Sequence, residues 1–360
     1  MTEVAQGGIH ELHLTLRPLP GEKPGILAGR LAGLLAEHEA VVVRQELFGS
    51  CAAQHKFMDG LRLAAGRVDW PISAIEGLPC GPEALAGTHV LAVAGSPVET
   101  IAHEGMPVGR VFRDAWARYV LLGDLQPEDP ARSKPDQAAQ VYETMEAVLN
   151  KAGLGIRQVA RTWLFLDDIL SWYGPLNAVR TRFYKEHKVF DHLVPASTGV
   201  GGRNARGTAM VAGAWAVEGL NGAFSVSEVA SPKQCPAPCY GSSFSRAVML
   251  TSPGLERLMV SGTASIEPGG ASVCADDVDG QIDLTMQVVR AILVSRGMDF
   301  AETSRATAYF KRASDVAAFE RWRAAHGLES WPVICAVDDI CRDELLFELE
   351  LDALRIPAQK

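Results

Sequence analysis

The sequence lacks a positive charge balance and long apolar runs. Its 34 Lys and Arg against 43 Asp and Glu give a formal net charge of −9, so no global basic field attracts nucleic acid or an anionic membrane. No uncharged apolar run approaches the roughly 18 residues that suggest a membrane span, and the first residues show no basic stretch followed by an apolar one. We therefore expect a soluble cytoplasmic protein that binds neither nucleic acid nor membrane.

Recognisable disulfide, metal and nucleotide motifs are also missing. The seven cysteines are scattered, at positions 51, 80, 235, 239, 274, 335 and 341, and an odd number in a chain of this length fits a reducing compartment. The CxxxC spacing at 235–239 has no second ligand pair, and the histidines show no HExxH pattern, so no metal is expected. The glycine-rich segment 195–206 lacks both the P-loop and the dinucleotide-binding spacing.

What the sequence does contain is a weak internal repeat. Residues 141–165 align without a gap to residues 285–309, at an offset of 144, and both read as a helix, a glycine and a strand. A more degenerate copy begins the chain, and Arg44, Arg161 and Arg305 take matching positions in the three copies.

The repeat predicts an α+β fold made of tandem units. Each unit has a mixed sheet that is packed by helices on one face, and its other face needs a cover that neighbouring copies can supply. We expect a pseudo-trimeric arrangement within one chain. The predicted divisions are a degenerate N-terminal region at 1–114, a second unit at 115–230 and a third unit at 231–360.

The strongest catalytic candidate is Glu348. The strand predicted over 347–354 alternates apolar and acidic residues, so Glu348, Glu350 and Asp352 share one face. That face could simply be solvated, but the equivalent segment of the second copy, 208–215, has no acid. An apolar outer face suggests that copies pack sheet against sheet, which would place Glu348 in a cleft. Desolvation there would raise its pKa and suit it to general-acid catalysis.

Other candidates surround this strand in the sequence. Cys341 lies seven residues before Glu348, across a predicted turn of the chain, and could lie near it. A small buried side chain is the simpler interpretation. The segment 195–206 offers backbone N–H groups and two guanidiniums, of Arg203 and Arg206, that could hold a carboxylate, or it could be only a hairpin connection. Arg180, on a predicted helix before it, is either another anion contact or a surface residue.

These residues resemble a known family. The motifs Phe244-Ser-Arg-Ala-Val, Val260-Ser-Gly-Thr-Ala, Trp331-Pro-Val-Ile-Cys and Phe347-Glu-Leu-Glu are similar to the YjgF/RidA superfamily, small α+β proteins with a chorismate-mutase-like fold and clefts between subunits. Tandem copies, together with the segments NAVRT at 177–181 and PASTGVGG at 195–202, resemble the chorismatases of the FkbO type. The resemblance covers residues 115–354 well and the first hundred weakly.

The resemblance implies an activity and a site. Chorismatases convert chorismate to pyruvate and either a dihydroxycyclohexadiene carboxylate or a hydroxybenzoate, without metal or organic cofactor. The superfamily's catalytic glutamate falls on Glu348, and a Cys at position 341 is associated with hydroxybenzoate formers, which favours 3-hydroxybenzoate. The two substrate carboxylates imply a clamp drawn from Arg161, Arg180, Arg203, Arg206 and Arg246. The other substrate-binding residues that it implies are Tyr173, Phe244, Ser261, Gly262, Ala264, Tyr309 and Cys335.

Two departures from the superfamily leave alternatives open. Pro332 is followed by Val333 where imine-hydrolysing members carry an Arg, and Phe244 stands where Tyr is common. The first departure counts against a RidA-like imine or enamine hydrolase, which remains one alternative. A non-catalytic module that binds a small acid is the other. Three units in one chain fit a monomer or a low homo-oligomer.

Overall fold

The first of three mixed β-sheets is built from the start of the chain. This computed structural model describes residues 1–79 and 84–357, so Cys80 lies outside the described residues. The first sheet has the order β1-β2-β6-β3-β4 and consists of β1 (Thr2–Gln6), β2 (Ile9–Leu16), β3 (Val41–Gly49), β4 (Ile72–Ile75) and β6 (Leu85–Ala94). Its helices are α1 (Pro24–Glu37) and α2 (Cys51–Ala65).

The second sheet has six strands in the order β11-β10-β12-β9-β8-β7. They are β7 (Glu99–His103), β8 (Met106–Arg113), β9 (Ala117–Leu125), β10 (Val159–Leu166), β11 (Ala196–Gly201) and β12 (Met210–Gly219). Its helices are α3 (Lys134–Lys151) and α4 (Ile169–Glu186), with the short 3-10 turns η1 (Ile156–Gln158) and η2 (Val189–Asp191).

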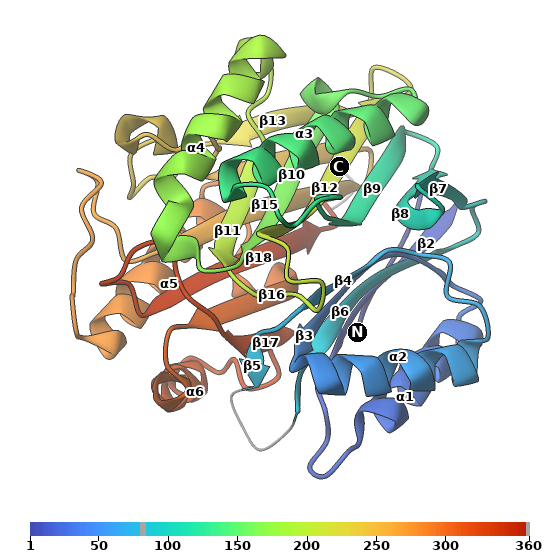
Figure 1. Cartoon of the computed structure of the whole chain (residues 1–360), viewed down its shortest axis with the longest axis horizontal. Helices are drawn as coiled ribbons and strands as arrows, with labels where there is room; N and C mark the ends of the chain where they lie inside the picture. The colour runs from blue at the N-terminus through green and yellow to red at the C-terminus, as the bar shows by residue number, and fades with distance from the viewer. Residues whose placement is uncertain (80–83, 358–360) are drawn as a thin grey trace.

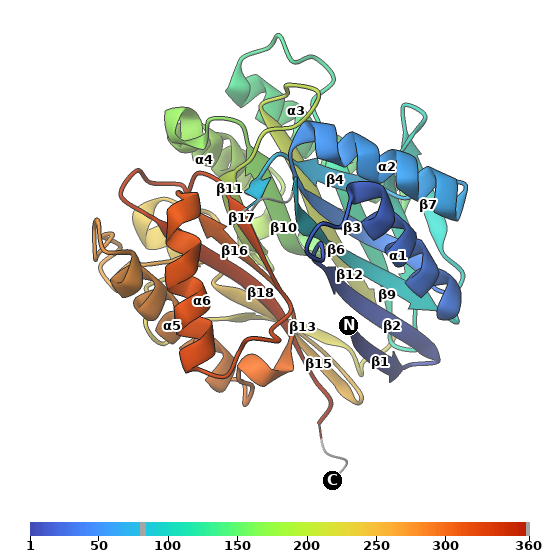
Figure 2. The same ribbon diagram turned by 90° about the horizontal axis from the view of Figure 1, so that it is seen from below.

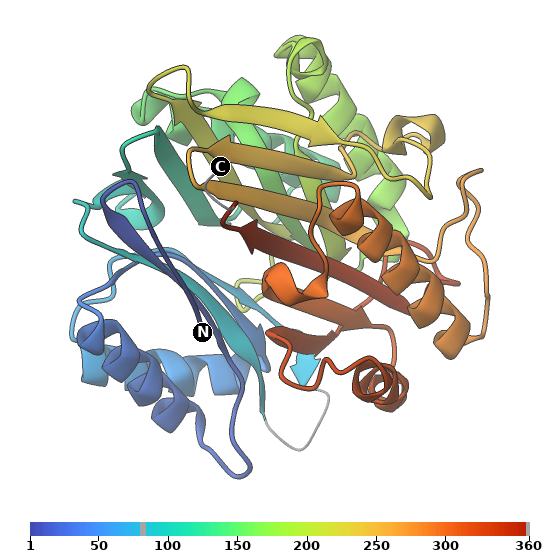
Figure 3. The ribbon, with the colours of Figure 1, turned by 180° about the vertical axis from the view of Figure 1, so that it is seen from behind.

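The third sheet has seven strands in the order β13-β14-β15-β18-β16-β17-β5 (Figure 3). They are β13 (Ser225–Val229), β14 (Ala247–Ser252), β15 (Leu255–Ala264), β16 (Thr303–Phe310), β17 (Val333–Val337), β18 (Phe347–Arg355) and β5 (Leu78–Pro79), a short strand from the first part of the chain. Its helices are α5 (Val278–Val294) and α6 (Val316–Ala325), with the turns η3 (Ala237–Tyr240), η4 (Phe300–Glu302) and η5 (Ala313–Asp315).

Strand pairing confirms the threefold repeat, including its degenerate first copy. Each sheet contains one parallel pair, β3 with β4, β10 with β11 and β16 with β17. Each also has a register irregularity directly before the repeat arginine, at Val42/Arg44, Val159/Arg161 and Thr303/Arg305. An extra residue at the same point of three strands gives them a common bend, so the three arginines occupy equivalent places.

The helices lie outside and the sheets face inward, as the views in Figures 1 and 2 show. Each helix pair covers one sheet with its own apolar core. A further core lies between the sheets and draws on all three, with Phe48 from the first, Trp163 from the second and Tyr309 from the third. This arrangement confirms the predicted α+β fold, in which the tandem units cover one another.

The sheets divide the chain at other residues than the predicted ranges. β7 and β8 precede residue 114 but pair with β9 in the second sheet, and β13 precedes residue 231 but pairs with β14 in the third. The reason is that each of these units opens with antiparallel strands that lie before its first helix, where the sequence repeat is weak.

None of the helices among residues 1–79 and 84–357 is both long enough and apolar enough to cross a membrane.

Candidate active site

A cleft of about 870 Å³ lies between the second and third units. The second unit contributes helix α4 and strand β11, and the third contributes β15, β18, the approach to β14 and the loop before β18. Of the predicted site residues, this cleft brings together Tyr173, Arg180, Phe244, Arg246, Gly262, Ala264, Cys341 and Glu348.

Glu348 projects into the cleft from the start of β18. It pairs with Ala264 of β15 on one side and with Tyr309 of β16 on the other, and its side chain is buried. A β-carbon added to Gly262 would overlap Oε1 of Glu348 and come within 3.2 Å of Cγ2 of Thr198. The carboxyl group therefore occupies the space that the glycine leaves empty, at a register irregularity of β15.

The surroundings of Glu348 favour its protonated form. Burial is the main cause and the charge of Glu350 adds to it, so the pKa of Glu348 rises to about 8, although Arg161 and Arg246 act in the opposite direction. A carboxyl with this pKa carries a proton at neutral pH and can donate it.

Helix α4 presents one polar face to the cleft. Tyr173, Asn177 and Arg180 follow a helical spacing of four and three residues, while Leu176 and Phe183 of the same helix pack into the core of the second unit. Asn177 accepts a hydrogen bond of 2.5 Å from Nη2 of Arg180, which holds the guanidinium in place.

Two buried guanidiniums in the cleft have no acidic partner. Arg180 and Arg246 lie within 6 Å of the Phe244 ring, at 5.7 Å and 5.6 Å from its centroid. Arg246 donates hydrogen bonds from Nε and Nη2 to the carbonyl oxygen of Cys235, at 3.0 Å and 2.9 Å. Every other buried arginine of the described chain forms an ion pair, and these two do not. An anionic ligand would supply the missing partners.

Cys341 also lines the cleft, but as a neutral thiol. Burial, followed by the charge of Glu348, raises the pKa of Cys341 to about 12. Burial and the neighbouring Cys341 likewise raise the pKa of Tyr173. Neither group is an anion near neutral pH, so both can act here as hydrogen-bond donors and as cleft walls.

Three predicted residues lie beneath the cleft rather than in it. Arg161 donates a hydrogen bond to Oε2 of Glu350 at 2.6 Å, and both side chains are fully buried. The hydroxyl of Tyr309 lies 3.4 Å from Oε1 of Glu350. Ser261 accepts a hydrogen bond from the backbone of Ser197 and donates one to the backbone of Ser245, so it joins the two units.

The other three predicted residues lie elsewhere. Arg203 is exposed and pairs with Glu76 at 2.8 Å, and Arg206 is also exposed. Cys335 packs against the outer core of the third unit, where burial raises its pKa to about 12. The glycine-rich segment instead reaches the cleft through its first part, with Ser197 and Gly199.

Several cleft residues were not predicted from the sequence. Tyr240, Ser242 and Arg342 line the cleft, and Arg182 and Lys185 add cationic groups from the end of α4. The sequence marks residues 231–241 only as a proline-rich connector, and nothing in that pattern predicts a wall of a cleft. The charges on α4 follow its helical spacing and could have been found with Arg180.

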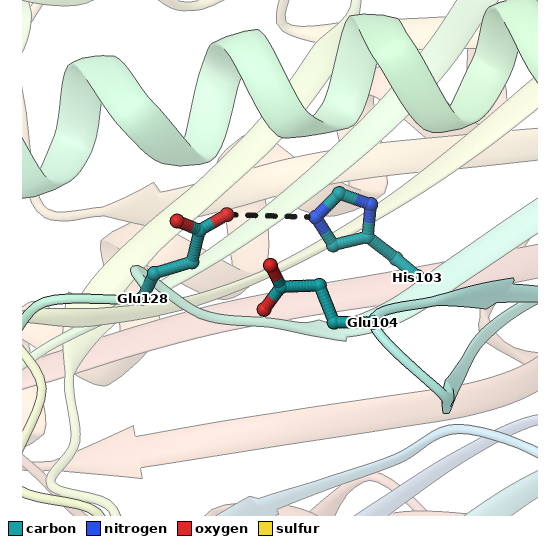
Figure 4. Close-up of side chains that lie close together, drawn as sticks. All are labelled: His103, Glu104 and Glu128. Carbon is teal, nitrogen blue, oxygen red and sulfur yellow. Dashed lines mark ion pairs between the residues drawn. The ribbon is translucent and has the colours of Figure 1, made fainter.

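One group of side chains could hold a metal ion. His103, Glu104 and Glu128 offer ligand atoms within 4.8 Å of one another, and Nε2 of His103 lies 3.7 Å from Oε1 of Glu128 (Figure 4). His103 and Glu104 lie at the turn between β7 and β8, Glu128 lies in the loop between β9 and α3, and none of the three residues lines the cleft. Both glutamates are exposed, and exposed acidic groups of this kind often lie together without a metal ion.

Fold and cleft together define an α+β protein of three fused units with a protonated acid and two unpaired guanidiniums at one joint between units. No protein-family model matches the chain. A chorismatase of Streptomyces hygroscopicus is 26% identical over 261 residues, which cover 66% of this chain and 73% of that protein. A solved structure of a chorismatase covers 98% of this chain and 99% of its own, with a TM-score of 0.69 and 18% identity. The YjgF gene product of E. coli covers 36% of this chain and 98% of its own, with a TM-score of 0.29 and 18% identity.

The predicted resemblance to the chorismatases, which are enzymes, is therefore confirmed. The solved structure agrees in fold over nearly the whole length of both chains.

Proposed function

We propose that this protein is a chorismatase that releases pyruvate from chorismate, with Glu348 as the general acid. The observation that carries the proposal is the composition of the cleft: one carboxyl that holds its proton at neutral pH faces two buried guanidiniums without acidic partners. Chorismate has two carboxylates and an enolpyruvyl ether that needs a proton. Its charges and its reactive group therefore match what the cleft leaves unsatisfied.

The chemistry begins at the ether. Glu348 transfers its proton to the methylene carbon, which leaves a carboxylate on Glu348 and an oxocarbenium ion on the substrate. Water then adds to the oxocarbenium carbon to form a hemiketal and returns one proton to the Glu348 carboxylate. The hemiketal breaks its bond to the ring oxygen, which takes up the remaining hydroxyl proton, and so releases pyruvate and the ring diol. Arg180 and Arg246 hold the two carboxylates, so the methylene carbon is oriented before the proton moves.

The second product is proposed to be 3-hydroxybenzoate. Pyruvate and a hydroxybenzoate together contain the atoms of chorismate, whereas pyruvate and the cyclohexadiene diol contain one more water. Loss of that water from the ring is favoured where bulk water is excluded. Cys341, a neutral thiol beside Tyr173 in the wall of the cleft, and the small side chain of Ala264 would shape this part of the site.

The test is an assay of the purified protein with chorismate and no added metal. Pyruvate is coupled to lactate dehydrogenase, and the second product is identified by chromatography. We expect pyruvate and 3-hydroxybenzoate, and we expect Glu348→Gln to remove both. Glu344→Gln is the matched control, because Glu344 is an exposed glutamate of the loop that leads into the same strand.

The possible results test the activity, its second product and the role of Glu348 separately. Pyruvate with a non-aromatic diol would keep the activity and refute the product. A protein that binds chorismate without releasing pyruvate would be the binding module considered above, and the catalytic role of Glu348 would be refuted.

A further inference from the structure

Directly beneath the cleft, Glu350 connects the second and third units. It follows Glu348 by two residues on β18, so both side chains point to the same side of the sheet. Glu350 is fully buried and ion-paired to Arg161 of β10 and Arg305 of β16. Thr198 of β11 donates a hydrogen bond to Oε2 of Glu350 at 2.5 Å and accepts one from the backbone N–H of Gly262 at 3.1 Å.

This pair belongs to a balanced cluster of buried charges. The three repeat arginines surround the indole of Trp163, with guanidinium carbons at 3.3, 5.0 and 5.5 Å from a ring centroid. Three carboxylates face them: Glu46 pairs with Arg44, Glu350 with Arg161 and Arg305, and Asp352 with Arg305. Burial alone would raise the pKa of Glu350, but Arg305 and Arg161 outweigh it and lower that pKa to about 2. The carboxylate is therefore ionised throughout the working pH range.

We infer that Glu350 is a positioning residue of the active site: by neutralising Arg161 and Arg305 across the joint, it keeps a net positive charge from forming beneath Glu348 and so preserves the acid's proton. This inference rests on the proposed function only in one respect, that the proton of Glu348 is the one given to the substrate. Without Glu350, three buried guanidiniums would face two carboxylates, and the excess positive charge would favour ionised Glu348.

The other groups around Glu348 do not replace this effect. The charged and titratable side chains that face it from the elements packed against it are Glu350 on β18, Arg161 on β10, Tyr309 on β16, Arg246 before β14, Tyr173 and Arg180 on α4, and Cys341 in the preceding loop. The same cleft is also lined by Tyr240, Arg342 and, at the end of α4, Arg182, Lys185 and Glu186. Besides Glu350, the charged groups that act on Glu348 are Arg161 and Arg246, which stabilise its carboxylate and favour release of the proton.

The test measures the titration of Glu348 directly. Carbon-13 NMR of glutamate carboxyl groups gives its midpoint without turnover, and the signal is assigned by its loss in Glu348→Gln. In Glu350→Gln we expect the midpoint to fall by at least about one pH unit. The kcat at pH 7 should then fall about twofold for a fall of one unit and about tenfold for a fall of two, because a smaller fraction of Glu348 is protonated. Arg161→Gln should move the midpoint upward, because it removes a positive charge and leaves Glu350 in place.

The double variant Arg161→Gln/Glu350→Gln removes one charge of each sign. It leaves Arg305 paired with Asp352, and its midpoint should return towards that of the unmodified protein. A role in folding alone would not restore a midpoint in this way. If one of the two single variants fails to fold, the other is still expected to shift the midpoint of Glu348 in its stated direction. An unchanged midpoint in either folded single variant overturns the inference, while absence of pyruvate from the unmodified protein refutes only the proposed function.

Discussion

The space above Gly262 gives the sharpest test of the active site. In Gly262→Ala the new methyl group would overlap Oε1 of Glu348, and the two cannot keep their present positions. Gly262 does not have a left-handed backbone conformation, so alanine introduces no backbone strain there. The atom that must move is the end of a flexible side chain. We therefore expect the carboxyl to shift by roughly 1 Å and the protein to stay folded, at a cost of about 1–3 kcal/mol in the free energy of unfolding.

A displacement of this size changes activity more than stability. Misplacing a reacting group by about 1 Å can cost about 100-fold in rate, so kcat for pyruvate release should fall by that factor. Gly199→Ala is the matched control: it adds a methyl group to the same cleft, but at an ordinary 3.7 Å from Cε2 of Tyr173, and should cost a few-fold at most. Coupled pyruvate assays and denaturant unfolding would be run on both variants. Gly262→Ala with kcat within a few-fold of the unmodified enzyme would refute the assignment of Glu348 as the acid.

Further predictions address the charges of the cleft. Because the raised pKa of Glu348 is about 8, the protonated form dominates below that value, and kcat should decline by about tenfold per pH unit above it; a profile that rises through pH 8 would contradict a general acid. Arg180→Gln and Arg246→Gln should each raise KM by about 10- to 100-fold through loss of a charge-assisted hydrogen bond, whereas Arg203→Gln should leave KM unchanged because that residue is exposed and paired with an acid outside the cleft. Cys341→Ala should keep pyruvate release within a few-fold, since a thiol with a pKa of about 12 is no nucleophile; loss of all activity would require a thiolate or an essential hydrogen bond.

The periodicity of the sequence predicts which face of a strand a residue lies on better than it predicts how deeply that residue is buried. Alternation along β18 correctly predicts that Glu348 and Glu350 share a face turned towards the neighbouring unit. It does not predict that Glu348 meets an open cleft while Glu350, two residues later, meets two guanidiniums in the interior. That difference depends on how β11 and α4 of the second unit pack against β18, with Thr198 of β11 bonded to Glu350 and α4 forming the wall of the cleft.

Packing between units also decides which arginines are free to bind an anion, and the sequence alone does not show this. Arg161 and Arg246 are similar candidates in the sequence, but one is neutralised by Glu350 and the other has no acidic partner. The repeat contained a usable signal: an arginine with equivalents at 44 and 305 belongs to the shared framework, whereas a site found at one joint must use residues that the copies do not share. Arg180 and Arg246 satisfy that condition.

Strand register explains why chemistry is assigned to one joint of three. The residue opposite Tyr309 on β18 is Glu348, and the equivalent pairs are Phe48 with Gly87 and Phe165 with Val211. Val211 is buried in the central core, and a β-carbon at Gly87 would meet Ile334 of the third unit at 3.0 Å. Neither place has room for a carboxyl and a ligand. Fusion of the units in one chain lets each joint carry different residues. At this register position two joints are closed, by a glycine against Ile334 and by a buried valine, and the third is left open around an acid.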